Sequence, residues 1–313
     1  MDPIVLRIAG VPEHFNLPWL LALERRAYVR AGIDLKWTTI PQGTGRMRDL
    51  MCNGEVDLAV MVTEGAVRGI IHGDPYRIVA QYVDTPLTWG MHMGTASKLE
   101  SADQLAEVPI AVSRLNSGSH LAALAYARSK GWARNENGIE VVNDLPGAVE
   151  RLKAPEAAVF FWEKYTTKHL VDDGTFRCLD EHRSTWPAFV IVASEAILAE
   201  HPKEVGRLLK VIRDQAAGLM QKKTAPEIIA QRYKLSVADA KAWFNGVKWN
   251  TGGPVDLEAM KRVVADLEPP PHPLPSVLSR PVMNAWTHAR MTTCPHALHR
   301  TPIRRHRRRL HHW

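Results

Sequence analysis

Short apolar runs alternate along the chain with segments in which apolar residues recur at helical spacing. The runs predict strands near residues 4–9, 33–40, 58–62, 76–83, 87–92, 109–112, 139–142, 157–161 and 189–193. The helical pattern covers residues 16–32, 43–53, 119–130, 145–152, 201–222, 225–233, 236–245 and 256–267. The run Leu58–Val62 is apolar without interruption, which is typical of a parallel strand buried on both faces. This order of elements predicts an α/β fold.

The alternation of strands and helices is interrupted once. Strands 76–83 and 87–92 follow each other with little room for a helix, and segments 84–92 and 184–190 look like crossings between two parts of the chain. We therefore expect a second domain inserted in the first, with residues 1–88 and 188–268 in domain I and 89–187 in domain II. Residues 269–313 are rich in proline, arginine and histidine and lack apolar periodicity, which predicts a disordered tail.

The net charge of +7 belongs to this tail. Residues 269–313 hold eight arginines and no acidic residue, which leaves 32 basic and 33 acidic residues for the rest of the chain. An arginine-rich tail can bind nucleic acid or an acidic surface electrostatically, but the same composition is also that of an extension without a function. We therefore expect no nucleic-acid partner except through the tail.

No stretch of the chain approaches the ~18 apolar residues that a membrane span needs. The three cysteines, Cys52, Cys178 and Cys294, are widely spaced, which argues against a disulfide framework and a structural zinc site. No nucleotide-binding fingerprint is present, so we expect neither a cofactor nor a metal. Met1 leads directly into the first strand without a signal peptide, which predicts a cytoplasmic protein, or a periplasmic one if a leader precedes this sequence.

Polar loops follow several of the predicted strands. Ligands of open α/β sheets bind at the carboxyl ends of the strands, so we expect these loops to line one crevice that binds a small molecule. The candidate ligand-binding residues are Glu13, His14, Phe15, Asn16, Thr44, Thr63, Glu64, Ser117, Gly118, Ser119, His120, Trp162, Glu163 and Trp186. This hypothesis assigns no residue a catalytic role.

Each candidate also has a plainer interpretation. The start of a helix at 117–120 offers N–H groups and a positive dipole end to a carboxylate, sulfonate or phosphate, yet it is also an ordinary N-cap. Asn16 is expected to cap a helix in either case, and the charge of Glu64 suits the first turn of a helix by itself. Trp162 and Trp186 are suitable walls for a ligand, although tryptophan is also a common core residue.

Four segments carry a resemblance to a known family. They are LRIAGVPEHFNLPWLLALERRAYVRAGIDLKW, GEVDLAVMVTEGAVRGIIHG, SRLNSGSHLAALAYARSKGW and FFWEKYTTKHLVDDGTFR. Over roughly residues 4–268 the chain resembles the type II periplasmic-binding-protein family, in particular its sulfonate, taurine, nitrate and thiamine-pyrimidine branch, which includes the thiamine-pyrimidine synthases. The fourth segment is similar to the Trp-Glu-Pro-Tyr segment of that branch, with Lys164 where proline is usual. The resemblance implies a two-domain clamshell that closes on its ligand.

The resemblance also implies a function. It points to a binding protein for a small anionic or zwitterionic organic solute, of the ABC-transporter substrate-binding type, with a permease as partner if the protein is exported. The alternative is a cytosolic enzyme on the same scaffold, a lyase or synthase of a thiamine-precursor or menaquinone pathway, with His120 or His14 as its base. The cysteine cluster of the synthases is missing near Trp186, which counts against that activity. Transport, sensing and catalysis remain three hypotheses.

Overall fold

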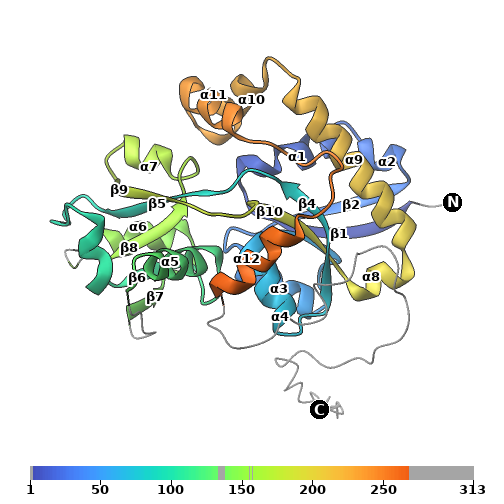
Figure 1. Ribbon diagram of the computed structural model, residues 1–313. Coiled ribbons are helices and arrows are strands. Elements are labelled where there is room, and N and C mark those ends of the chain that lie inside the picture. Colours follow the sequence, from blue (N-terminus) through green and yellow to red (C-terminus); the bar gives the residue numbers. More distant parts are fainter. Residues whose placement is uncertain (1–2, 133–137, 155, 157, 268–313) are drawn as a thin grey trace, which may run out of the picture.

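The computed structural model describes residues 3–132, 138–154, 156 and 158–267. These residues form two five-stranded sheets with helices packed around them, and the sheets lie side by side in the molecule (Figure 1). The prediction of an α/β fold is therefore confirmed. Among the described helices, none is long and apolar enough to cross a membrane. The tail predicted at 269–313 lies outside the described residues.

The first sheet has the strand order β2-β1-β3-β10-β4. Its strands are β1 (Ile4–Gly10), β2 (Ile33–Thr39), β3 (Leu58–Val62), β4 (Tyr76–Val83) and β10 (Phe189–Ser194). β1 pairs in parallel with β2 and β3, whereas β10 is antiparallel to both of its neighbours, β3 and β4. A strand from late in the chain thus occupies an inner position, which explains why the apolar run at 189–193 is buried throughout.

The second sheet has the strand order β7-β6-β8-β5-β9. Its strands are β5 (Thr88–Gly94), β6 (Ile110–Val112), β7 (Ile139–Val141), β8 (Val159–Glu163) and β9 (Phe176–Arg183). β6 is parallel to β7 and β8, and β5 is antiparallel to β8 and β9. The sequence pattern missed β9, because this edge strand carries mostly charged and partly exposed residues and has no apolar run to reveal it.

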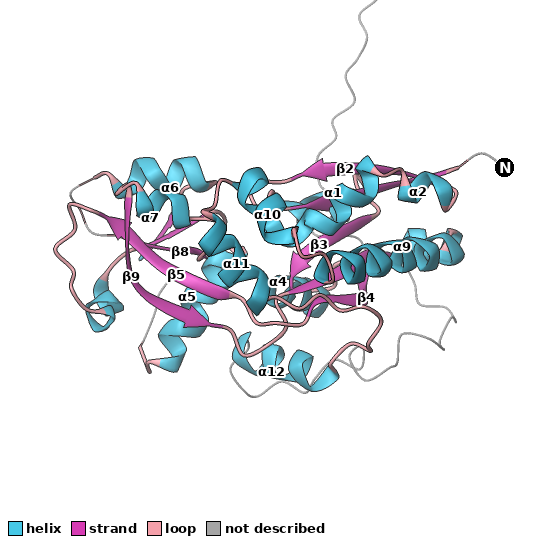
Figure 2. Ribbon diagram, turned by 90° about the horizontal axis from the view of Figure 1, so that it is seen from above, coloured by secondary structure: helices cyan, strands magenta, loops and turns pink. Residues whose placement is uncertain are grey.

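All strands of the second sheet lie between β4 and β10 in the sequence. The chain therefore crosses between the sheets twice, at residues 84–87 (the first crossing) and 184–188 (the second crossing), within the two segments expected from the sequence. We call residues 4–83 and 189–267, which contain the first sheet, lobe I, and residues 88–183, which contain the second, lobe II; in the view from above the two sheets lie on opposite sides of the molecule (Figure 2). The domain boundaries at residues 88 and 188 stay a prediction.

The helices surround both sheets. They are the 3₁₀ helix η1 (His14–Asn16), α1 (Leu17–Glu24), α2 (Ala27–Arg30), α3 (Thr44–Cys52), α4 (Thr63–Ile71), the 3₁₀ helix η2 (Ala102–Glu107), α5 (Gly118–Ser129), α6 (Leu145–Leu152), α7 (Lys168–Asp172), α8 (Glu195–Glu200), α9 (Pro202–Met220), α10 (Ala225–Tyr233), α11 (Val237–Gly246) and α12 (Leu257–Leu267). The single helix predicted at 16–32 is wrong, since Arg26 adopts a left-handed φ of 53° and divides it into α1 and α2. α12 packs against both α4 and α5 and so touches both lobes.

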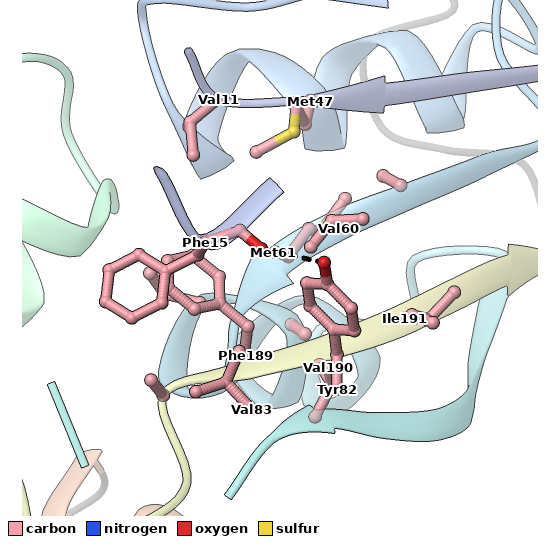
Figure 3. Packing of buried hydrophobic residues seen from close by; sticks show 14 of the residues in the cluster. Val11, Phe15, Met47, Val60, Met61, Tyr82, Val83, Phe189, Val190 and Ile191 are labelled. Carbon is pink, nitrogen blue, oxygen red and sulfur yellow. Dashed lines mark hydrogen bonds between the residues drawn. The ribbon is translucent and has the colours of Figure 1, made fainter. Parts of the chain in front are cut away.

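The loop after β1 is fixed by the core of lobe I. The Phe15 ring packs on Phe189, with the ring centroids 4.9 Å apart. The backbone carbonyl of Phe15 accepts hydrogen bonds from the Tyr82 hydroxyl at 2.7 Å (Figure 3) and from the Trp249 indole at 2.9 Å. These contacts hold residues 11–16 in place at the edge of the sheet that faces lobe II.

Candidate ligand-binding site

A cavity lies where the ends of strands from both sheets meet. Lobe I supplies Val11, Glu13, Gly43, Thr44, Val62 and Phe189, the first crossing supplies Leu87, and lobe II supplies Trp89, Ser113, Gly118, Ser119, Trp162 and Glu163. Its volume is about 30 Å³, enough for about two water molecules. Of the candidates from the sequence, the lining includes Glu13, Thr44, Gly118, Ser119, Trp162 and Glu163. The expectation that strand-end loops of the two parts converge thus matches the geometry.

Two buried carboxyl groups reach this cavity from opposite lobes. Glu13 lies in the loop after β1 and is 7 % exposed, and Glu163 is the last residue of β8 and is 3 % exposed. Burial, and secondly the charge of Glu163, raise the pKa of Glu13 to about 8. Burial raises the pKa of Glu163 to about 7, although Oε2 accepts hydrogen bonds from the backbone N–H and the hydroxyl of Thr166 at 2.7 and 2.9 Å. The pair therefore retains protons at neutral pH.

His14 lies beside the cavity rather than in its lining. Its Nε2 is 3.6 Å from Oε2 of Glu163, which is too long for a hydrogen bond. Burial lowers the pKa of His14 to about 3, so its imidazole is neutral and the contact is not an ion pair. The ring packs edge-on against Trp243, at a centroid distance of 4.1 Å. Among the described residues, no three His, Cys, Asp or Glu side chains come together as a metal-binding group.

The serines at the start of α5 hold one another. Ser117 is the N-cap residue, and its Oγ accepts a hydrogen bond from the backbone N–H of His120 at 3.4 Å. The Oγ of Ser119 accepts from the backbone N–H of Ser113 at 3.1 Å and lies 3.0 Å from the Oγ of Ser117. Ser117 therefore acts as an ordinary N-cap residue outside the cavity lining. Ser119, in contrast, both stabilises the loop and lines the cavity.

His120 faces the loop before its own helix. Its Nδ1 accepts a hydrogen bond from the backbone N–H of Asn116 at 2.9 Å, which places the proton of the neutral ring on Nε2. That Nε2 is buried and has no hydrogen-bond partner among the described residues. Burial, and secondly the charge of Arg68, lower the pKa of His120 to about 4. A general base works best with a pKa near the working pH, so the pKa values of His120 and His14 count against the base role that the enzyme hypothesis gives them.

Three other candidates, Thr63 and Glu64 of α4 and Trp186 of the second crossing, lie outside the cavity lining. Trp186 donates a hydrogen bond from Nε1 to Oε2 of Glu64 at 2.9 Å. The Thr63 hydroxyl donates to the carbonyl of Pro187, and its backbone N–H donates to the carbonyl of Ala188 at 3.0 Å. Burial raises the pKa of Glu64 to about 7, and the bond from Trp186 opposes that rise. These residues attach the second crossing to the start of α4.

Phe15 and Asn16 also lie outside the cavity lining. Phe15 belongs to the core of lobe I, as described above. Asn16 is the N-cap residue of α1, as predicted, but its side chain donates from Nδ2 to the carbonyl of Val11 at 2.9 Å and makes no capping hydrogen bond. Both residues hold the loop that carries Glu13.

The candidates from the sequence did not include seven of the lining residues: Val11, Gly43, Val62, Leu87, Trp89, Ser113 and Phe189. The apolar members end or begin buried strands, and a one-dimensional pattern does not distinguish an apolar ligand wall from core. Ser113 directly follows β6, so the rule that polar residues follow the strands would have found it.

Two α/β lobes, joined by two crossings and facing each other across a cavity, define the type II periplasmic-binding-protein fold. The resemblance seen in the sequence is therefore confirmed at the level of the fold. Residues 89–182 match a family model described as a Ca3427-like periplasmic binding protein. No curated protein sequence matches this chain.

Solved structures support the same fold. The Candida albicans CA3427 gene product, described as defining a new family with the generic periplasmic-binding-protein fold, is 24 % identical, with a TM-score of 0.78 over 84 % of this chain and 88 % of that one. The alkanesulfonate-binding protein SsuA of Xanthomonas axonopodis pv. citri, bound to MOPS, is 17 % identical, with a TM-score of 0.68 over 85 % and 91 %. The periplasmic nitrate-binding protein NrtA of Synechocystis PCC 6803 is 14 % identical, with a TM-score of 0.60 over 85 % and 81 %.

Proposed function

We propose that this protein binds a small organic solute between lobe I and lobe II, and that movement about the two crossings opens and closes the site. One observation carries this proposal: the cavity is lined from both sheets, at the carboxyl ends of β1, β3, β6 and β8. Ligands of open α/β sheets bind at such strand ends, and here two of these edges face each other. A volume of about 30 Å³ is too small for an organic solute, so the lobes must separate to admit one.

The composition of the lining bears on the kind of solute. The sequence led us to expect an anionic or zwitterionic molecule. No lysine or arginine is among the described residues that line the cavity, whereas Glu13 and Glu163 are. Of the two expected classes, a zwitterion fits this lining better than a simple anion, because its positive group offsets the two carboxylates.

The proposed role is that of an ABC-transporter substrate-binding protein, which delivers its solute to a permease. Structures of the same fold that are named for alkanesulfonate and nitrate binding support a solute-binding role. In this role the solute leaves the protein chemically unchanged. No histidine is among the described residues that line the cavity, so the base that the enzyme hypothesis names would not touch a solute there.

The test is a thermal-shift screen of the full chain against alkanesulfonates, carboxylates, amines, amino acids and aminopyrimidines, with mass spectrometry of the bound compound. We expect a solute that raises the melting temperature, lowers the radius of gyration in small-angle X-ray scattering and is recovered unchanged. The variant Trp162→Ala, which alters a cavity wall, should lose most of this affinity. A compound recovered as a different molecule would instead support the enzyme hypothesis.

A further inference from the structure

We propose that the solute is recognised through a positively charged nitrogen group, a protonated amine or amidine, held between the carboxylates of Glu13 and Glu163. This inference rests on the proposed function, because it names the chemical class of solute for the same cavity. It departs from the expectation of an anionic ligand and makes the positive group, rather than a negative one, the feature that the site selects.

Glu13 is the first argument. Its carboxyl group is buried, lines the cavity and accepts no hydrogen bond from any residue that the structure describes. A buried carboxylate without a donor is strongly unfavourable in a folded protein. A donor placed in the cavity itself therefore stabilises the ionised form, and a protonated nitrogen supplies both hydrogen bonds and charge.

The second argument is the position of Glu163 on the opposite lobe. The two hydrogen bonds from Thr166 hold its Oε2 at the end of β8. It is close enough to Glu13 for its charge to raise the pKa of that residue. Because the carboxylates belong to different lobes, closure brings like charges together, and a cation between them turns this repulsion into attraction.

Among the described residues, no nearby positive group neutralises the carboxylates of Glu13 and Glu163. Lys164, which follows Glu163, lies with its Nζ 2.7 Å from the carboxylate of Glu181, and its charge lowers the pKa of Glu163 by less than burial raises it. His14 is neutral, as its lowered pKa requires. Burial raises the pKa of Tyr233 well above its ordinary value, and the charge of Glu13 contributes to that rise. The charged and titratable groups packed around the pair thus leave it negative whenever both carboxyl groups are ionised.

The walls of the cavity suit a cation as well. Trp89 and Trp162 lie in its lining, and the faces of indole rings attract ammonium and amidinium groups. The hydroxyl of Ser119 already lies in hydrogen-bonding distance of Ser117 and accepts from Ser113. An anion at the first turn of α5 would meet backbone N–H groups there, but it would also meet two carboxyl groups in the same small space.

The experiment compares matched molecules that differ only in charge. Propylamine and benzylamine, propionate and benzoate, and the corresponding alcohols are titrated into the full chain at pH 7 by calorimetry, with β-alanine as a zwitterion. We expect the amines to bind and the carboxylates and alcohols not to bind; β-alanine binding as well would place zwitterions in the class. A cation favours the ionised pair, so binding should release protons, and the heat should depend on the ionisation enthalpy of the buffer.

Three variants locate the effect. Glu13→Gln and Glu163→Gln should each weaken amine binding about tenfold or more and reduce the proton release. Asp74→Asn is the control, because Asp74 is a buried carboxylate, 7 % exposed like Glu13, that pairs with Arg48 outside the cavity lining. It should leave the affinity for amines unchanged. Circular dichroism confirms that each variant folds.

The outcomes separate this inference from the proposed function. Carboxylates that bind while amines do not, or proton uptake on binding, would overturn the cation class and leave a solute-binding cavity intact. Amine binding that survives both glutamine variants would also overturn it, since the charge would be recognised elsewhere. If neither the matched series nor the wider thermal-shift screen yields a ligand, both the inference and the proposed function fail.

Discussion

Trp186 in the second crossing donates a hydrogen bond to the buried carboxyl group of Glu64, 122 positions earlier in the chain, at 2.9 Å. Glu64 stands in the first turn of α4 in lobe I, so this bond joins one of the two connections between the lobes to a helix that packs against the first sheet. Next to it, Thr63 bonds to the carbonyls of Pro187 and Ala188. The second crossing is thus attached to lobe I at consecutive residues, and rotation of lobe II has to begin before Trp186.

We expect Trp186→Phe to destabilise the protein more at pH 8 than at pH 5. The pKa of Glu64 is raised to about 7, and the bond from Trp186 favours its ionised form. Loss of that donor leaves the buried carboxylate with only a backbone N–H above pH 7, at a cost of about 1–3 kcal/mol, whereas at pH 5 the carboxyl group is protonated. Urea unfolding at the two pH values measures the difference. The lost ring volume affects both pH values alike, so an equal loss at each would contradict the role of this bond.

Stability should fall as the pH rises from about 6.5 to about 8.5. The pKa values of Glu13, Glu64 and Glu163 lie at about 8, 7 and 7, above the ordinary 4.5. The folded protein therefore keeps protons that the unfolded chain has lost, and each such group lowers the free energy of unfolding by up to about 1.4 kcal/mol per pH unit. Urea midpoints across this range test the slope, and Glu64→Gln should make it shallower.

Stability should also fall on the acid side. The buried histidines with lowered pKa are His14, His92 and His120, at about 3, 4 and 4. Their folded pKa values lie below the ordinary 6.5, so the stability they contribute is complete above pH 6.5 and is lost as the pH falls toward those values. With the opposite trend of the carboxyl groups, this predicts a stability maximum near pH 6. A free energy of unfolding that rises steadily to pH 8.5 would contradict both assignments.

Gly118→Ala should weaken solute binding without unfolding the protein. A Cβ atom at Gly118 would lie 3.0 Å from Cη2 of Trp89 in lobe II and 3.2 Å from Cγ2 of Val62 in lobe I. Both distances are tight, and separation of the lobes relieves the second, so the variant should favour the open form. Calorimetric titration with a solute from the thermal-shift screen measures the loss of affinity.

Gly206→Ala is the matched control for that variant. No atom lies within 4 Å of a Cβ at this position in α9. Its affinity should equal that of the unmodified protein, and its free energy of unfolding should rise by about 0.5–1 kcal/mol, because alanine favours a helix more than glycine does. Equal affinities for the two alanine variants would show that Gly118 is not a closing contact.

The sequence predicted the parts of the site that depend on local order. Glu13 and Glu163 were found because each stands at the end of a buried apolar run, and parallel strands gather those ends at one edge of a sheet. The strand predicted at 157–161 is in fact β8 (Val159–Glu163), so Glu163 belongs to the strand itself. The apolar pattern located this strand beside Glu163 but placed both of its ends two residues too early.

The rest of the fold and of the site depends on contacts between distant segments, which no local sequence pattern predicts. β10 is inserted between β3 and β4, and this strand order is set by long-range pairing. The bond between Trp186 and Glu64 joins distant segments. Sequence analysis placed Glu64 in the ligand site because it follows the strand 58–62, and Trp186 because it is an aromatic residue near a crossing. The raised pKa values arise from burial, which a sequence shows only indirectly.

Two ion pairs that join lobe I to lobe II should stabilise the closed form. Nη2 of Arg114 in lobe II lies 3.3 Å from Oδ2 of Asp49 in α3, and Nζ of Lys168 in α7 lies 3.8 Å from Oδ2 of Asp239 in α11. All four side chains are partly exposed, and such a pair contributes about 0.2–1 kcal/mol. Because separation of the lobes breaks both pairs, Arg114→Ala should weaken solute binding about twofold to fivefold at low salt.

Salt and a control variant identify the cause. Screening should remove the difference between Arg114→Ala and the unmodified protein at about 1 M salt, where the Debye length is about 3 Å. Lys210→Ala breaks an exposed pair with Asp214, at 2.7 Å, within the single helix α9. It should change solute affinity at neither salt concentration, because opening of the lobes leaves that pair intact. An equal effect of the two variants, or one that persists at high salt, would mean that the pair at Arg114 does not favour closure.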